Sequence, residues 1–160
     1  MIYLFGGSFN PFHIEHEKCV NEIKLLLKND DKIMIVPVYS PWKPQEFLNI
    51  DERIDLIKYI YQNDSSVSVS NLGKDSLYMF DIVDKVKAEY KQDICLVMGQ
   101  DTFESVAKWH RYEECKNNVK ITIIPRVSNI SSTLIRNNLI NNKNLLSDKA
   151  SEYLFDVLKK

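Results

Sequence analysis

The chain has 160 residues and a formal net charge of −1 at pH 7, with 44% hydrophobic, 27% charged and 11% aromatic residues. This composition predicts one globular domain over residues 1–160, because a chain of this length buries about 70% of its unfolded surface without a metal or disulfide. The near-neutral charge argues against bulk electrostatic binding of nucleic acid, and no apolar run approaches the roughly 18 residues that span a bilayer. We therefore expect no nucleic-acid or membrane partner.

The cysteines indicate a reducing compartment. Cys19, Cys95 and Cys115 are far apart in the sequence and form no Cys-x-x-Cys pair, which fits reduced thiols better than a disulfide framework or a zinc site. The first five residues lack the basic segment of a signal peptide. We expect a cytoplasmic protein, with Cys19 buried as free cysteines usually are.

Apolar runs rich in β-branched residues alternate with helical patterns along the chain. The runs at 32–38 and 94–99 are continuous and predict strands buried on both faces. Asp51 is expected to cap the second helix, and the fourth helix is expected to break near Trp109. The expected strands are 1–5, 32–38, 66–70, 94–99 and 119–125, and the expected helices are 13–29, 52–63, 76–90, 101–116, 131–141 and 147–159.

This alternation predicts an α/β fold, a Rossmann-like, doubly wound parallel sheet of about five strands, with a helical C-terminal part at about 131–160. Ligands of such sheets bind beyond the carboxyl ends of the strands, at the point where the strand order reverses. Four segments with chemically interesting residues follow expected strands, at 6–16, 39–43, 99–101 and 126–136. We expect the functional site at that edge of the sheet.

The strongest motif is the segment 6–16, Gly-Gly-Ser-Phe-Asn-Pro-Phe-His-Ile-Glu-His. Gly6 and Gly7 permit backbone angles and close approaches that a Cβ forbids, and backbone N–H groups here and at the next helix start can bind an anion. His13 and His16 are three residues apart, so both rings share one helix face and can donate hydrogen bonds to a phosphate in a transition state. Alternatively, the glycines form a plain turn and the histidines a surface pair. No third ligand is nearby in the sequence, so we predict no metal site.

This segment resembles the signature of the cytidylyltransferase-like nucleotidyltransferases, which carry a His-x-Gly-His motif, and its form is closest to the bacterial nicotinate-mononucleotide adenylyltransferases. The resemblance implies an α/β-phosphodiesterase-type nucleotidyltransferase fold. It also implies an enzyme of NAD biosynthesis that joins ATP, carried with Mg²⁺, to nicotinate mononucleotide and releases pyrophosphate and deamido-NAD. Such transfers depend on positioning and charge stabilisation. It implies that loop residues contact the acceptor and α-phosphate and that two histidines stabilise the α-phosphate: Gly6, Gly7, Ser8 and Phe9, with His13 and His16.

A second segment, 130–136, resembles the Ile-Ser-Ser-Thr-x-Ile-Arg sequence of the same family. Hydroxyls and N–H groups at a helix start, with an arginine in its first turn, suit a phosphate. Alone, the segment would be a helix cap with a surface arginine. The resemblance implies phosphate binding by Ser131, Ser132, Thr133 and Arg136.

Weaker matches lie between these two motifs. The resemblance places Lys43 at the ATP phosphates, Gly99 and Asp101 at the adenosine, Arg126 near the nucleotide, and Tyr78, Met79 and Trp109 at the acceptor, with Trp109 stacked on the nicotinate ring. Each has a plainer interpretation. Trp109 could be a core residue and Asp101 a helix cap, and Arg53, another family match, could be a surface residue paired with Asp51 or Asp55.

The sequence also departs from the family pattern. Glu15 replaces the motif glycine, although helical geometry directs it about 130° away from the mean direction of the two histidines. Met79 replaces a threonine of the acceptor pocket and offers no hydroxyl donor. The segment between Arg126 and Ser131 is shorter than in the family. We therefore expect that a homo-oligomer of this chain would use contacts that differ from those of the family.

These departures keep other functions open. The acceptor could be nicotinamide mononucleotide or phosphopantetheine, or the chain could be a diverged nucleotide-binding module without catalysis. A dehydrogenase is disfavoured because the dinucleotide glycine pattern and the acidic residue after the second strand are missing. A scaffold without a ligand would explain neither motif.

Overall fold

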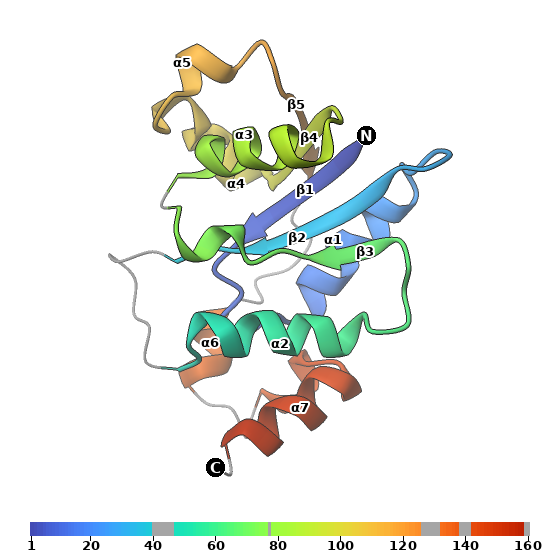
Figure 1. The fold of residues 1–160 in the computed structure, drawn as a ribbon. Coiled ribbons are helices and arrows are strands. Elements are labelled where there is room, and N and C mark those ends of the chain that lie inside the picture. Colours follow the sequence, from blue (N-terminus) through green and yellow to red (C-terminus); the bar gives the residue numbers. More distant parts are fainter. Residues whose placement is uncertain (40–46, 77, 126–131, 138–141, 159–160) are drawn as a thin grey trace.

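The computed structural model describes residues 1–39, 47–76, 78–125, 132–137 and 142–158, and only the backbone of residues 133, 134, 137 and 143 (Figure 1). Its centre is one parallel sheet of five strands in the order β3-β2-β1-β4-β5. This confirms the predicted doubly wound parallel sheet. The strands are β1 (Ile2–Gly7), β2 (Lys32–Pro37), β3 (Val67–Val69), β4 (Ile94–Gly99) and β5 (Lys120–Ile124).

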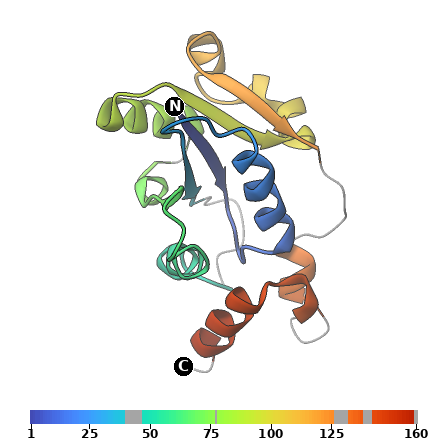
Figure 2. The same cartoon turned by 90° about the vertical axis from the view of Figure 1, so that its right-hand side faces the viewer.

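Helices cover both faces of this sheet. In Figure 1, α3 lies on one side of the strands and α2 and α7 lie on the other, and Figure 2 shows α1 on the side of α6 and α7. The α-helices are α1 (Ile14–Lys24), α2 (Ile50–Ile60), α3 (Met79–Tyr90), α4 (Gln100–Ser105), α5 (Tyr112–Cys115), α6 (Ser132–Asn137) and α7 (Asp148–Leu158). Three short 3₁₀ turns are η1 (Leu72–Lys74), η2 (Val106–Lys108) and η3 (Lys143–Leu145).

The two faces bury separate apolar clusters, because successive strand residues point to opposite sides of a sheet. Tyr3 and Phe5 of β1 belong to the cluster beneath α1, α2, α6 and α7. Ile2 and Leu4 belong to the cluster beneath α3 and α5. At about 25 cal/mol per Å² of apolar surface removed from water, these clusters are the main stabilising contribution.

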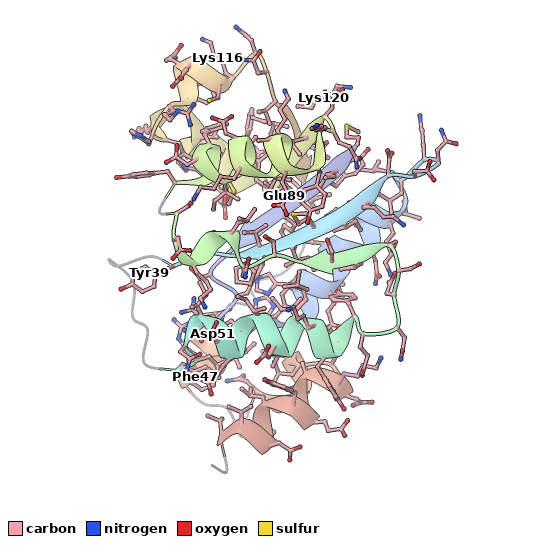
Figure 3. All side chains as sticks on the ribbon, viewed as in Figure 1. Tyr39, Phe47, Asp51, Glu89, Lys116 and Lys120 are labelled. Carbon is pink, nitrogen blue, oxygen red and sulfur yellow. The ribbon has the colours of Figure 1, made fainter. Side chains whose placement is uncertain are left out.

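Several local expectations need correction. Asn49, not Asp51, caps α2: its side chain accepts from the Glu52 N–H at 2.8 Å, and Glu52 accepts from the Asn49 N–H at 3.0 Å. Asp51 lies at the exposed start of the helix (Figure 3) and pairs with Lys74 at 2.8 Å. α1 ends at Lys24, earlier than the periodicity predicted, and Leu26 is 39% exposed.

The strand order determines where on the sheet a ligand site can form. β1 pairs with β2 on one side and with β4 on the other, so the chain reverses its direction of winding between β3 and β4. The carboxyl ends of β1 and β4 therefore adjoin each other, where such folds bind ligands. Within the described residues, no helix has the length and apolar character that a membrane crossing requires.

Candidate nucleotide site

A cavity of about 330 Å³ opens at the carboxyl ends of β1 and β4. Its volume lies within the range of small-molecule sites. One wall comes from the end of β1, the loop after it and the start of α1, and the remainder comes from β4, β5, α3, α4, the residue after η2, and α6. Among its lining residues are Gly6, Gly7, Ser8, Phe9, His13, His16, Met79, Gly99, Thr102, Trp109 and Ser132.

The two glycines allow close approach rather than unusual backbone angles. Neither has a positive φ, and the residue in the left-handed region is Phe9, at φ 50°. A Cβ on Gly6 would lie 2.1 Å from the terminal methyl of Met79, and a Cβ on Gly7 would lie 3.0 Å from the Phe9 ring. Phe9 is buried and packs edge-on against Phe5 at 5.3 Å between ring centroids, which holds the strained turn in place.

His13 and His16 form a stacked pair with ring centroids 3.7 Å apart. His13 is the N-cap of α1, and its Nδ1 accepts a hydrogen bond from the Glu15 N–H at 3.2 Å. The Nδ1 of His16 accepts from the His13 N–H at 3.0 Å. Each neutral ring therefore carries its proton on Nε2 and is a donor there. The two imidazoles occupy helix-start N–H groups that we expected to bind an anion directly.

The two sequence motifs meet at this cavity. The hydroxyl of Ser132 donates to the Pro11 carbonyl at 2.8 Å, and Arg136 donates through Nη1 to the Asn10 carbonyl at 2.6 Å. Both carbonyls belong to the loop after β1, although the partners lie more than 120 residues away in the sequence. α6 thus brings a guanidinium and a hydroxyl to residues 8–13 between β1 and α1, which we call the histidine loop.

Arg53 is buried beneath that loop, which rules out the alternative of a surface residue paired with Asp51 or Asp55. It is 1% exposed, and it donates to the carbonyls of Leu48 at 3.1 Å, Ser8 at 3.2 Å and Val38 at 3.4 Å. Burial lowers the pKa of Arg53, and the nearby charge of Arg136 lowers it further. Two guanidinium groups close together concentrate positive charge next to the histidine loop, which favours an anionic ligand.

Of the expected acceptor residues, Met79 and Trp109 line the cavity and Tyr78 does not. Trp109 is half-buried and also packs edge-on against Phe80 at 6.1 Å, so it is at once a core contact and a cavity wall. Tyr78 lies instead in a neighbouring hollow, with its ring 4.3 Å from that of His110.

The expected nucleotide residues are only partly brought together. Gly99 lines the cavity and is the N-cap of α4, so Asp101 is not the cap. Thr102 lines the cavity where we expected Asp101, which is exposed in the first turn. Lys43, Arg126 and Ser131 lie outside the described residues, as does the side chain of Thr133.

Two residues of α1 that were not assigned to the site also line it. Glu15 is part of the cavity wall, although its helical direction suggested otherwise, and its carboxylate accepts from Lys18 at 3.2 Å. Cys19, one turn further along α1, is half-buried rather than buried. Burial raises the pKa of the Cys19 thiol, and Glu15 and Glu22 raise it further, so the group is neutral at pH 7. The sequence contained a signal for this pair, because Glu15 and Cys19 are four residues apart and therefore lie on the same face of a helix.

Comparison with the sequences of known proteins agrees with the two motifs that meet at the cavity. The sequence model of the cytidylyltransferase-like family matches residues 4–138. A probable nicotinate-nucleotide adenylyltransferase of Aliarcobacter butzleri is 35% identical over 130 residues, covering 78% of this chain and 71% of the relative. One of Fusobacterium nucleatum is 33% identical over 153 residues, covering 91% of this chain and 77% of the relative.

Structural comparison supports the same fold. A putative nicotinate-nucleotide adenylyltransferase from Vibrio parahaemolyticus has a TM-score of 0.78 at 24% identity, covering 97% of this chain and 91% of that one. The nicotinic acid mononucleotide adenylyltransferase of Plasmodium falciparum, solved with NaAD, has a TM-score of 0.75 at 17% identity, covering 98% of this chain and 95% of that one.

Proposed function

Because the chain belongs to the cytidylyltransferase-like family and, within it, to the nicotinate-nucleotide adenylyltransferases, we propose that it transfers an adenylyl group from ATP to nicotinate mononucleotide. A phosphate oxygen of the acceptor attacks the α-phosphorus of ATP and forms a new P–O–P linkage. The bond between the α-phosphorus and the β-phosphate oxygen breaks, and pyrophosphate leaves. The products are deamido-NAD and pyrophosphate, and the reaction belongs to NAD biosynthesis in the cytoplasm.

The observation that carries this proposal is the stacked pair His13 and His16 on the cavity wall. Both rings have Nδ1 engaged by backbone N–H groups, which sets both Nε2 atoms as donors without a change of protonation. Donors fixed before the reaction stabilise charge that develops on the α-phosphate, at no cost of reorganisation. Their role is therefore electrostatic, and no covalent intermediate is required.

The remaining roles rest on the family resemblance of the sequence motifs, supported for some of the described residues by the lining of the cavity. The loop residues Gly6, Gly7, Ser8 and Phe9 would hold the acceptor and the α-phosphate. Phosphates of ATP would be bound by Ser131, Ser132, Thr133, Arg136 and Lys43, with Gly99, Asp101 and Arg126 nearer the nucleoside. Met79 and Trp109 would contact the pyridine ring, with Tyr78 behind them.

We propose that Mg²⁺ enters with the triphosphate. Among the described residues, no three or more His, Cys, Asp or Glu side chains are grouped so that they could hold a metal ion. The phosphate oxygens of ATP would then supply most of the ligands, and bound Mg²⁺ would offset the charge of the departing pyrophosphate. Arg136 and the serine hydroxyls would orient the triphosphate from the protein side.

Pyrophosphate release tests the proposal. We would assay the protein with ATP, Mg²⁺ and nicotinate mononucleotide, beside nicotinamide mononucleotide and phosphopantetheine. Preference for nicotinate mononucleotide is expected. A signal with another acceptor alone would retain adenylyl transfer and change the substrate. Nucleotide binding without pyrophosphate from any acceptor would identify a binding module.

A further inference from the structure

Met79 and Trp109, which we propose contact the acceptor, line one end of the cavity, here called the acceptor end. They belong to two segments that are 30 residues apart in the sequence. Met79 begins α3, and Trp109 follows η2. Neither segment is tied to the other by sheet hydrogen bonds, so side chains must set the distance between Met79 and Trp109. Two ring contacts contribute, Tyr78 with His110 at 4.3 Å and Phe80 with Trp109 at 6.1 Å.

An ion pair joins the same two segments. Arg111, two residues after Trp109, donates through Nη1 to Asp81 at 2.8 Å, and Asp81 is two residues after Met79. The Arg111 side chain is 26% exposed and that of Asp81 is 35% exposed. Arg111 also pairs with Asp84, at 2.7 Å, and with Glu114, at 2.8 Å from Nε, but these carboxylates are 52% and 65% exposed. The bond to Asp81 is therefore the least screened of the three.

The backbone of Arg111 is adapted to this contact. Its φ is 68° and ψ is 14°, the left-handed region that residues other than glycine rarely adopt, and it lies directly before α5. Glu114 accepts from both Nε and Nη2, which leaves Nη1 directed at Asp81. A guanidinium can make these contacts simultaneously because its donors form a rigid fork, whereas an ammonium cannot.

We infer that Arg111 and Asp81 are positioning residues that set the width of the acceptor end, and hence the affinity for the acceptor rather than for ATP. This inference rests on the proposed function. Neither residue touches the reacting atoms. Loosening the pair would let Trp109 and Met79 move apart, and displacements of about 1 Å at a binding wall are enough to change substrate use strongly.

The test compares Asp81→Asn and Arg111→Lys with wild type, with KM measured separately for nicotinate mononucleotide and for ATP. We expect each variant to raise the acceptor KM at least about fivefold, with the ATP KM within about twofold of wild type. The double variant should be no worse than the poorer single variant, because both substitutions remove one interaction. Arg111→Lys keeps the charge, so it also covers the case in which Asp81→Asn folds poorly.

Two matched variants control for surface charge. Glu113→Gln and Lys116→Ala each break the exposed ion pair between these two residues at the outer end of α5, where Figure 3 labels Lys116, and leave the carboxylate partners of Arg111 in place. Both should leave the acceptor KM within about twofold. Equal effects on both KM values, an unchanged acceptor KM, or a Glu113→Gln effect as large as that of Asp81→Asn would overturn the inference. Wild-type protein without acceptor-dependent pyrophosphate release would instead contradict the proposed function, and calorimetric titration with nicotinate mononucleotide alone would then decide whether Asp81→Asn still weakens binding.

Discussion

At the residue scale, His13 has two separable tasks. Its Nδ1 caps α1, and in the proposed reaction its Nε2 would donate to the α-phosphate. Replacement by alanine would remove the helix cap and the proposed donor together, and loss of an N-cap alone costs about 1 kcal/mol of stability. Asparagine is among the best N-cap residues and has no counterpart of the Nε2 donor, so it separates helix capping from catalysis.

We predict that His13→Asn keeps the thermal unfolding midpoint close to wild type while kcat falls by about 100-fold or more. Circular dichroism melts and pyrophosphate release measure the two quantities. Asn49→Ala, which removes the corresponding cap of α2 away from the cavity, should do the reverse and lower stability with little change in kcat. Near-normal turnover of His13→Asn would refute the electrostatic role of this imidazole.

Gly6 and Gly73 differ in what surrounds them, although a Cβ on either would lie 2.1 Å from a neighbouring atom. At Gly6 the neighbour is the flexible end of Met79, whereas at Gly73 it is the backbone carbonyl oxygen of Pro37. A side chain can move, but a strand carbonyl cannot move without disturbing the sheet. The same substitution should therefore have different consequences at the two sites.

We predict that Gly73→Ala destabilises the protein by about 1–3 kcal/mol and that Gly6→Ala costs less than this. Gly6→Ala should instead raise the acceptor KM severalfold, because it pushes Met79 into the cavity, and Met79→Ala in the same chain should reverse that increase. Urea unfolding and acceptor titrations distinguish these effects. Failure of Met79→Ala to restore the acceptor KM would contradict this account of the contact.

At the scale of elements, Arg53 connects three segments through their carbonyls: the histidine loop, the end of β2 and the start of α2. Removing the guanidinium would leave three carbonyl oxygens without this donor, and a buried polar group left unsatisfied costs about 1–3 kcal/mol. The substitution would also alter the cavity, because Ser8 belongs to the histidine loop and lines the cavity.

Arg53→Met should therefore lower the free energy of unfolding by about 3 kcal/mol and reduce turnover in the folded fraction. Lys58→Met, at an exposed position of the same helix, provides a control that should change stability by less than about 0.5 kcal/mol. Chemical denaturation measures both. An Arg53→Met protein as stable as wild type would show that the three carbonyls do not need this partner.

Glu17 of α1 is half-buried in a hollow shared with the end of α2 and the start of α7. Burial raises the pKa of Glu17 above its ordinary value of 4.5, against the opposing effects of Ser147 and Lys149. Because the folded state holds this proton more tightly than the unfolded state, the favourable contribution is present below pH 4.5 and is lost as the pH rises through the folded pKa.

Glu17→Gln should consequently be more stable than wild type at pH 7, with the difference shrinking toward pH 4. Thermal melts across this range measure it, with the exposed Glu22→Gln on the same helix as the control. A difference that grows as the pH falls would contradict the assigned direction of the pKa shift.

At the scale of the whole molecule, much of the architecture follows from periodicity. β4 occupies its predicted residues 94–99, and the expected interruption near Trp109 appears as the break between η2 and α5. The edge of the sheet that carries the site was also predictable, because it depends only on the order of strands and crossovers.

Other features depend on contacts that a single sequence does not display. Asn49 and Asp51 are both good cap residues, and the reciprocal bond to Glu52 decides between them, a signal present in the Asn-x-x-Glu spacing. The burial of Arg53 and the contact of Met79 with Gly6 have no such local pattern, because their partners come from distant segments. Thr102 rather than Asp101 lines the cavity, and this likewise depends on the residue at which α4 begins.

The most direct test of the account is the fate of the α-phosphate of ATP. With ATP labelled at the α-phosphorus, Mg²⁺ and nicotinate mononucleotide, we predict that the label appears in a dinucleotide in equal amount to the pyrophosphate released, and that none becomes attached to the protein. Label retained in ATP, or found on the protein or in free AMP instead of a dinucleotide, would contradict direct adenylyl transfer at the paired histidines.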